Sequence, residues 1–297
     1  MPSAPIKLVV GFPPGGTVDI LVRLLSPNLS AQMNNASVIV ENKPGANGNI
    51  ACEFVAKSAP NGSTLLFNSS GVILSRALGE KLGYDLFSEL VPVTLVSSTP
   101  LLLTVPTFSP LSRVDEFIAH LRKNANKLAY GSAGTGSMTH LGPVMFLYTN
   151  GLNALHVPYK GAAPVLLDTI AGRIQFAMQT LTASASLVKD GRLKALAITS
   201  LNRSAMFPDV PTLSEFMPGF EITSWNGAMV AAKTPAAVVN RLNSELRKAL
   251  QDSALKARLA QEGTEVLSSS SEDYAAYLRS ENARWTKTIN AAGISAE

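Results

Sequence analysis

The sequence predicts an α/β protein, and three observations support this fold class. From residue 6 to about residue 230, short β-branched apolar runs alternate with longer segments of helical periodicity, as they do in βαβ units around mainly parallel sheets. From residue 235 onward the periodicity is mostly helical. The 297 residues, 46% hydrophobic and 15% charged, suffice for two domains, or one large one, with a substantial core.

The first predicted unit is a strand, a turn and a helix. Residues 6–10 are short, apolar and β-branched, as in a buried strand, and the glycines and prolines of residues 11–16 end it. Thr17 then begins a segment with helical spacing, and Asp19 lies in its first turn, where the helix dipole favours an acid. We expect Pro27 to kink or shorten this helix.

The same reasoning places the remaining elements along the chain. Further predicted strands cover residues 37–40, 64–67, 101–105 and 128–131. The predicted helices comprise one ending at Val55, residues 114–123, residues 140–148, and three C-terminal runs ending at Leu250, Leu259 and about Ala291. The short serine run at residues 268–271 leads into the last of these helices.

Charge and cysteine content narrow the classes of function. The net charge is +4, but the basic residues form no cluster, so we expect no nucleic-acid partner. The single cysteine, Cys52, can form no intramolecular disulfide and fits a small buried apolar position. No apolar run reaches the roughly 18 residues that span a bilayer. No signal peptide is recognisable, which fits a cytoplasmic protein and equally a mature exported protein with an added start methionine.

The common catalytic motifs are missing from the sequence. It contains no G-x-S-x-G elbow and no G-x-x-x-x-G-K-[ST] phosphate loop, and Thr139 stands where a third glycine would complete G-x-G-x-x-G. The three histidines lack metal-binding spacing. We therefore expect no catalytic residue, no metal and no cofactor. An enzyme that uses carboxylates assembled by the fold remains the alternative.

Two glycine-rich loops carry the binding chemistry that the sequence does offer. Residues 12–17 and 132–137 each follow a predicted strand, combine glycine with small hydroxyl residues, and begin a helix. Unpaired N–H groups and the dipole make a helix N-terminus attractive to anions, and Thr17, Ser132 and Ser137 can add hydroxyl donors. The pair predicts carboxylate binding. The alternative is that both are ordinary tight turns with self-capping hydroxyls.

A third strand-to-helix junction lies at residues 156–164, with Pro164 suited to the first helical turn. Tyr159 fits a pocket wall and a core position equally well. Lys160 is better explained as a solvated charge than as an anion ligand. For His140, early in the helix after the second glycine loop, a structural hydrogen-bonded role is favoured over ligand contact.

An ordered series of motifs resembles one known family. The motifs are residues 5–19, 40–48, 59–66, 130–141, 157–161, 196–212, 224–227 and 281–285. They resemble the Bug receptors, the periplasmic substrate-binding proteins of tripartite tricarboxylate transporters. The resemblance extends over the full length of the chain.

The resemblance implies a type II periplasmic-binding-protein fold, in which two α/β lobes enclose a ligand cleft. It places residues 1–100 and 228–297 in one lobe and residues 101–227 in the other. It implies an extracytoplasmic, periplasmic solute receptor that closes like a Venus flytrap on a small carboxylate and delivers it to the membrane subunits of the transporter. We expect a monomer. A ligand-sensing partner of a regulatory membrane protein would have the same pocket and stays open.

Carried over by position, the resemblance assigns the ligand-binding residues. They are Phe12, Gly15, Gly16, Thr17, Asp19, Asn68, Ser69, Ser132, Gly134, Gly136, Ser137, Tyr159, Gly161 and Trp225.

One departure from the family pattern bears on the ligand. Gln179 stands where relatives commonly have an aspartate, and we expect it to line the site. A neutral amide does not repel a second carboxylate and can donate a hydrogen bond to it. We therefore expect a dicarboxylate, aliphatic or aromatic, rather than an amino acid. The alternative is that Gln179 faces away from the pocket.

Overall fold

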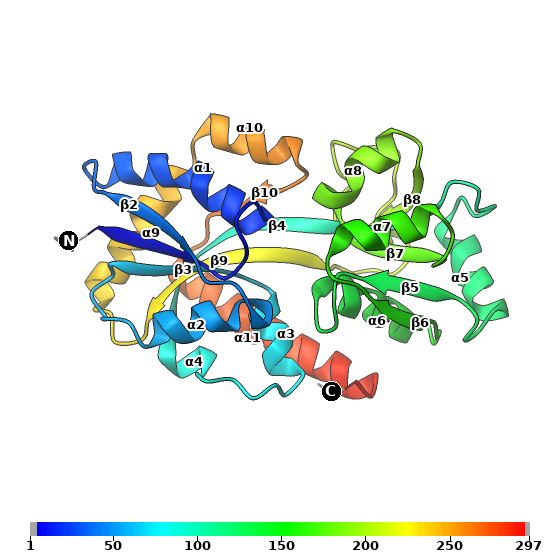
Figure 1. The fold of residues 1–297 in the computed structure, drawn as a ribbon, viewed down its shortest axis with the longest axis horizontal. Helices are drawn as coiled ribbons and strands as arrows, with labels where there is room; N and C mark the ends of the chain where they lie inside the picture. The colour runs from blue at the N-terminus through cyan, green and yellow to red at the C-terminus, as the bar shows by residue number, and fades with distance from the viewer. Residues whose placement is uncertain (1–4, 295–297) are drawn as a thin grey trace.

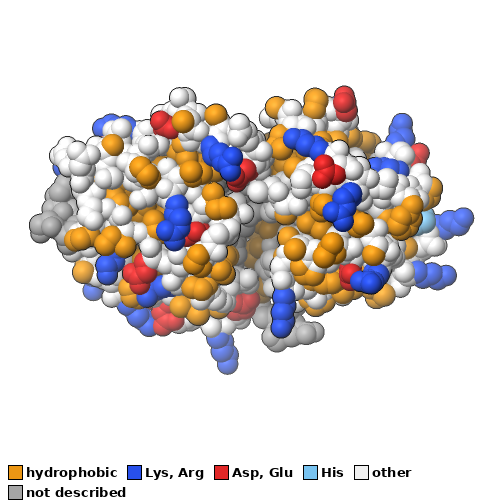
Figure 2. Space-filling model, turned by 45° about the horizontal axis from the view of Figure 1, so that its top comes forward, with side chains coloured by type: hydrophobic (Ala, Val, Ile, Leu, Met, Phe, Trp, Pro, Cys, Tyr) orange, Lys and Arg blue, Asp and Glu red, His pale blue; other side chains and the backbone are white. Residues whose placement is uncertain are grey.

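The computed structural model describes residues 5–294 as two α/β lobes that lie side by side and are joined by two long strands (Figure 1). The lobe that contains the chain's first strands is called the N-terminal lobe, and the other the middle lobe. Figure 2 shows a furrow between them. Among the described residues, no helix is long and apolar enough to cross a bilayer.

The N-terminal lobe is a sheet covered by helices on both faces. Its strands are β1 (Ile6–Val10), β2 (Val38–Asn42), β3 (Thr64–Ser69), β10 (Glu265–Val266) and parts of the two joining strands. Its helices are α1 (Thr17–Gln32), the 3₁₀ turn η1 (Ala46–Gly48), α2 (Asn49–Ala56), α3 (Gly71–Ala77), α4 (Leu86–Glu89), α9 (Ala236–Leu250), α10 (Ser253–Gln261) and α11 (Ser271–Ala291).

Strand β1 shows why this sheet is buried on both sides. Leu8 and Val10 belong to a core that includes residues of α1 and α9, whereas Val9 belongs to a second core with residues of α2, α3 and α11. Successive side chains of a strand point to opposite faces. A nearly continuous apolar run is therefore what a doubly covered strand requires.

The middle lobe repeats this layered plan. Its strands are β5 (Ala129–Ser132), β6 (Leu155–Pro158), β7 (Phe176–Thr180) and β8 (Leu193–Ile198). Its helices are α5 (Val114–Lys123), α6 (Met138–Thr149), α7 (Ala162–Ile170), α8 (Leu181–Lys189) and the 3₁₀ turn η2 (Leu213–Glu215). Residues of α5 and α6 share a core with Phe176, whereas Val165 of α7 packs with Ala177 on the other face.

Two strands, β4 (Leu90–Pro106) and β9 (Thr223–Ala231), pass between the lobes (Figure 1). They pair antiparallel from Leu90 opposite Ala231 to Pro100 opposite Thr223. From Leu101 onward β4 pairs with β7 and β8 instead. This change of partner supports our proposal that the lobes divide near residue 100, as residues 1–100 plus 228–297 and residues 101–227.

One local expectation was wrong, and another was wrong in part. The sheets are mixed rather than mainly parallel, because β9, β4, β8 and β10 form antiparallel pairs beside the parallel pairs of β1 and β5 with their neighbours. Of the two outcomes expected at Pro27, a kink or a shorter helix, the shortening does not occur, since α1 continues to Gln32. Buried Leu25 and Leu29 on either side of the proline anchor the helix to the core, and such packing outweighs the lost backbone hydrogen bond.

Candidate functional site

The first glycine loop connects β1 to α1 at the edge of the N-terminal lobe that faces the middle lobe (Figure 1). Gly16 is the N-cap residue of α1. Among the described residues, the N–H groups of Thr17 and Val18 have no hydrogen-bond partner. They are the unpaired donors that a helix N-terminus presents to an anion, and Thr17 is exposed.

The Asp19 side chain stabilises the conformation of this loop through hydrogen bonds. One of its carboxylate oxygens accepts hydrogen bonds from the Gly15 N–H at 2.8 Å and from Arg23 Nε at 2.9 Å, and the other accepts from Asn42 Nδ2 at 2.8 Å. Asn42 Nδ2 also donates to the Phe12 carbonyl at 3.0 Å. Asp19 is 2% exposed, so it holds the loop in shape.

The electrostatics of Asp19 agree with that positioning role. Burial raises the pKa of the carboxyl, but the hydrogen bonds from Arg23, Gly15 and Asn42 together outweigh it and hold the pKa at about 2. The group is therefore a permanent anion whose oxygens are both occupied. A general acid or base needs a pKa near the working pH, so Asp19 does not suit the enzymatic alternative.

Two further loops of the N-terminal lobe reach the same edge. Asn68 is fully buried. Its Nδ2 donates a hydrogen bond to Cys52 Sγ, and its Oδ1 accepts one from the Ser69 N–H at 2.7 Å. A Cβ on Gly48 would lie 2.5 Å from Asn68 Oδ1, so η1 packs directly on this side chain. Asn68 therefore supports the loop from behind, and Ser69 is its half-buried outer residue.

The second glycine loop, between β5 and α6, uses its own hydroxyl groups. Ser137 Oγ donates to the Gly134 carbonyl at 2.6 Å. Ser132 Oγ accepts from the Gly134 N–H at 3.2 Å, and Thr139 Oγ1 accepts from the Ala133 N–H at 2.8 Å. The self-capping expected as an alternative is thus present. It coexists with free donors at the start of α6, where the N–H groups of Met138 and Thr139 have no partner among the described residues.

Glycine is required at two positions of this loop. Gly134 has φ +140°, a conformation that other residues rarely adopt. Gly136 lies against the opposite lobe, since a Cβ there would be 3.0 Å from Leu78 Cδ1 and 3.6 Å from Asn47 Nδ2. The loop therefore approaches η1 and the end of α3 across the furrow. Asn47 was not among the site residues expected from the sequence. Its position between Gly45 and Gly48 in one of the motifs could have indicated it.

Two histidines support the same loop from the middle lobe. The Gly136 N–H donates to His140 Nδ1 at 3.2 Å, and Ser132 Oγ lies 2.7 Å from His156 Nε2. The imidazole rings stack with their centroids 3.9 Å apart. His140 therefore has the structural hydrogen-bonded role that the sequence favoured, and His156 was missed as its partner because the two are brought together only by the fold.

The third junction, between β6 and α7, adjoins this loop through the backbone. The Tyr159 N–H donates to the Ser132 carbonyl at 3.0 Å, and the Gly161 N–H to the Ala133 carbonyl at 3.2 Å. The Tyr159 hydroxyl donates to Asp168 at 2.8 Å. Burial, with this hydrogen bond as the next cause, raises the pKa of Tyr159 to about 12. Lys160 is exposed.

Gln179 and Trp225 are both buried in this structure. Gln179, near the end of β7, donates from Nε2 to the Gly131 carbonyl at 3.4 Å, and its Oε1 has no hydrogen-bond partner within residues 5–294. Trp225 in β9 is 1% exposed and donates from Nε1 to Glu281 at 3.3 Å. In this conformation Trp225 stabilises β9 from within the core and presents almost no surface to the furrow.

The arrangement of the loops, helices and joining strands is typical of one class of protein. Three helices of 16, 12 and 9 residues, α1, α6 and α7, begin at loops that follow strands whose ends face the other lobe (Figure 1). Ligands of open α/β sheets bind outside the carboxyl ends of the strands. Two lobes with such facing edges, joined by two crossing strands, constitute a bilobed solute-binding protein.

Comparison with known proteins identifies the family. Residues 21–294 match the model of the tripartite tricarboxylate transporter family receptor. Protein BugT of Bordetella pertussis is 31% identical over 295 residues, covering 98% of this chain and 90% of BugT. The chain therefore belongs to the tripartite tricarboxylate transporter receptor family, which includes the Bug proteins. Its members are periplasmic solute-binding receptors rather than enzymes.

Solved structures agree in fold over the whole chain. The Rhodopseudomonas palustris protein Rpa4515, solved with adipate, superposes with a TM-score of 0.86 at 32% identity and covers 99% of both chains. MatC of the same organism, solved with malate, gives a TM-score of 0.82 at 27% identity, covering 97% of this chain and 100% of MatC. The periplasmic-binding-protein fold expected from the motifs is confirmed.

Proposed function

We propose that the protein is an extracytoplasmic receptor that binds a small dicarboxylate between its lobes and delivers it to a tripartite tricarboxylate transporter. The observation that carries this proposal is the meeting of the α1, α6 and α7 N-termini, from both lobes, at one furrow. Each N-terminus favours negative charge by about 0.3–1 kcal/mol or more when partly buried. A ligand with two carboxylates can engage both lobes at once.

We divide the expected site residues into two groups. The proposed contact group contains the loop residues that are exposed or half-buried; it consists of Phe12, Gly15, Gly16, Thr17, Ser69, Gly134, Ser137, Tyr159 and Gly161. The proposed supporting group contains the buried residues that hold those loops in place; it consists of Asp19, Asn68, Ser132, Gly136 and Trp225. The division rests on burial.

Two observations favour a dicarboxylate over an amino acid. Adipate and malate, the ligands of the two solved relatives, are dicarboxylates without an amino group. Gln179 carries no charge to attract an ammonium group. Its amide nitrogen already donates to Gly131, so we propose that Gln179 accepts from an ordered water or a ligand hydroxyl rather than donating to a carboxylate.

Membership of the family supports the proposed location and partners. We propose that the protein works in the periplasm as a monomer, with the membrane subunits of the transporter as its partners. A sensing role beside a regulatory membrane protein would use the same loops and the same closure.

Calorimetry with adipate, malate, aspartate and glutamate tests the proposal. We expect saturable binding of at least one dicarboxylate, and at least tenfold weaker binding in Gly16→Val and Gly134→Val, because their side chains obstruct the backbone donors. Gln179→Asp should weaken dicarboxylate binding through charge repulsion. Binding of aspartate or glutamate alone would contradict the dicarboxylate assignment, and unchanged affinity in both glycine variants would remove these loops from the site.

A further inference from the structure

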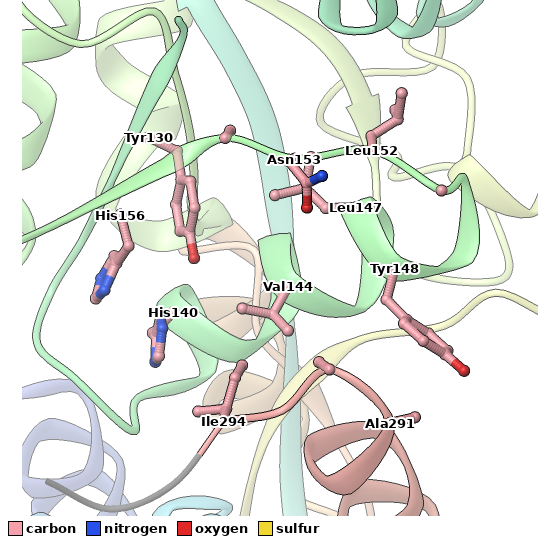
Figure 3. Close-up of a pocket in the computed structure, with 13 residues that line it drawn as sticks. Tyr130, His140, Val144, Leu147, Tyr148, Leu152, Asn153, His156, Ala291 and Ile294 are labelled. Atoms are coloured by element: carbon pink, nitrogen blue, oxygen red, sulfur yellow. The ribbon is translucent and has the colours of Figure 1, made fainter. Parts of the chain in front are cut away.

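A separate pocket of about 600 Å³ lies behind the second glycine loop, on the side of the sheet covered by α6 (Figure 3). Its walls come from β5, β6, α6, the segment between α6 and β6, and residues 291–294 at and just after the end of α11. The lining includes Tyr130, His140, Val144, Leu152, His156 and Ile294. This volume is within the range of small-molecule sites, and the lining shares no residue with the proposed contact group of the furrow.

One end of the pocket is polar, and its histidine tautomers follow from the loop contacts. His140 Nδ1 accepts the Gly136 N–H, so the neutral ring carries its proton on Nε2. Ser132 is fully buried, and among the described residues His156 Nε2, at 2.7 Å, is the acceptor within reach of its hydroxyl proton, so we assign Ser132 Oγ as the donor. The neutral His156 ring therefore carries its proton on Nδ1.

Both rings remain neutral near pH 7. Burial, with the neighbouring His156 as the second cause, lowers the pKa of His140 to about 4. Burial also lowers the pKa of His156. Two imidazoles stacked 3.9 Å apart would repel each other if both were charged. Each ring accordingly offers one N–H donor and no charge.

Three donors meet at this end of the pocket. They are His140 Nε2–H, His156 Nδ1–H and the Tyr130 hydroxyl, none of which has a protein partner among the described residues. None of the three is among the fully buried polar atoms that lack a partner, so each reaches the open space. Figure 3 shows the Tyr130 hydroxyl directed toward the two histidines.

The other end of the pocket is apolar. Val144, Leu147 and Leu152 line it from the middle lobe, and Ala292 and Ile294 line it from the end of α11. A ligand that satisfies both ends has an acceptor-rich head and an apolar body. A carboxylate suits the head, because it accepts several hydrogen bonds and needs no counter-charge when it meets convergent N–H and O–H donors.

We propose that this pocket is a second ligand site, which takes a small monocarboxylate with an apolar body, such as an aromatic acid. The proposal does not depend on the ligand of the furrow, since it rests on donors and volume of a different cavity. The two sites share one wall, because Ser132 and Gly136 are bonded to the two histidines. Because α11 packs on α3, the pocket is also bounded by both lobes.

Benzoate is the probe for the test, with the histidine ring nitrogens observed by ¹⁵N-correlated NMR at pH 7.5. We expect saturable shifts of the His140 and His156 signals, while His120 on α5, outside the pocket, serves as the internal reference. Tyr130→Phe removes one donor at nearly constant volume and should weaken benzoate about 3–10-fold.

Blocking variants locate the binding. Ala154→Trp and Ala292→Trp fill the pocket from opposite sides at residues that are only half-buried, and each should abolish the histidine shifts. Gly16→Val, in the opposite wall of the furrow, is the matched control and should leave benzoate binding unchanged. Absence of saturable histidine shifts, shifts that persist in both tryptophan variants, or shifts lost in Gly16→Val would each overturn the second site, the last by assigning benzoate to the furrow.

Discussion

Several polar side chains beside the furrow are bonded to the loops around them. Asp19 is the clearest case, because three protein donors occupy its carboxylate while the backbone above it stays free. The same holds for Ser132, whose buried hydroxyl group accepts from the Gly134 N–H within its own loop. The proposed carboxylate ligand would therefore meet mainly backbone N–H groups, as anions do at helix N-termini.

The first prediction concerns Asp19. Asp19→Asn replaces one acceptor oxygen by an amide donor facing protein donors, so we expect a loss of about 2–4 kcal/mol in the free energy of unfolding and weaker dicarboxylate binding. Urea titration and calorimetry measure the two effects. Asp209→Asn, with an exposed side chain, is the control and should change stability by less than about 0.5 kcal/mol. Equal stability of Asp19→Asn and the parent would contradict the organising role.

The second prediction concerns pH. The pKa of His140 is lowered from 6.5 to about 4, chiefly by burial and then by His156. Between these values the unfolded chain binds a proton that the folded protein does not. The His140 contribution to stability is therefore complete above pH 6.5 and is lost as the pH falls toward 4, by about 1–2 kcal/mol at pH 5.

Urea unfolding at pH 7 and pH 5 tests this dependence. His140→Asn keeps an acceptor near the Gly136 N–H but cannot titrate, so the variant should lose less stability between the two pH values than the parent protein. Equal losses in both proteins would show that His140 is not responsible.

At the scale of elements, a hydrogen bond with the C-terminal helix α11 holds the strand β9, which passes between the lobes, against the core. Glu281 of α11 accepts from Trp225 of β9 at 3.3 Å and from Trp285 at 3.2 Å, and its other oxygen pairs with Arg284 at 2.7 Å. The carboxylate is 5% exposed. This one side chain therefore joins the last helix to a strand that links the lobes.

The third prediction follows from that junction. Glu281→Gln removes the charge and places an amide donor among indole donors, so we expect a loss of about 2–3 kcal/mol in the free energy of unfolding. Glu272→Gln, exposed in the first turn of the same helix, makes the same chemical change and should cost less than about 0.5 kcal/mol. Similar losses in the two variants would contradict a special role for the Glu281 contacts.

The sequence predicted elements well where local periodicity decides them. The helix at residues 114–123, the start of a helix at Thr17 and the short parallel strands follow from spacing and turn residues alone. It predicted only the second part of β4, because Pro92, Pro100 and several serines and threonines weaken the strand pattern of the first part. That segment is a strand because β9, more than 120 residues later in the chain, pairs with it.

In the candidate site, too, the sequence predicted features that depend on neighbouring residues and missed contacts between residues far apart in the chain. Both glycine loops are visible in the sequence because their turns are local. The internal use of their hydroxyl groups, the His140–His156 stack and the approach of Gly136 to Asn47 depend on residues that only the fold brings together. Trp225 was expected at the wall because its motif is distinctive, but a motif does not tell a wall residue from a core residue.

At the scale of the whole molecule, the two lobes are joined by two strands and also contact each other directly. Gly136 against Leu78 and Asn47 is one such point. Domain pairs joined in this way move by hinge closure, with a few residues absorbing the change. The change of pairing partner of β4 between Pro100 and Leu101 marks where that change would be absorbed.

The last prediction is that ligand closes the lobes. A dicarboxylate that engages the N-termini of both lobes binds the closed form more tightly than the open one and therefore shifts the population toward it. Saturating ligand should reduce the radius of gyration measured by small-angle X-ray scattering. It should also raise the melting temperature, because ligand at 100 times its dissociation constant adds about 2.7 kcal/mol of stability. Gly16→Val, impaired in binding, should show neither change at the same ligand concentration. A higher melting temperature with an unchanged scattering profile would mean that the ligand binds lobes already closed around it, and closure would then not be part of recognition.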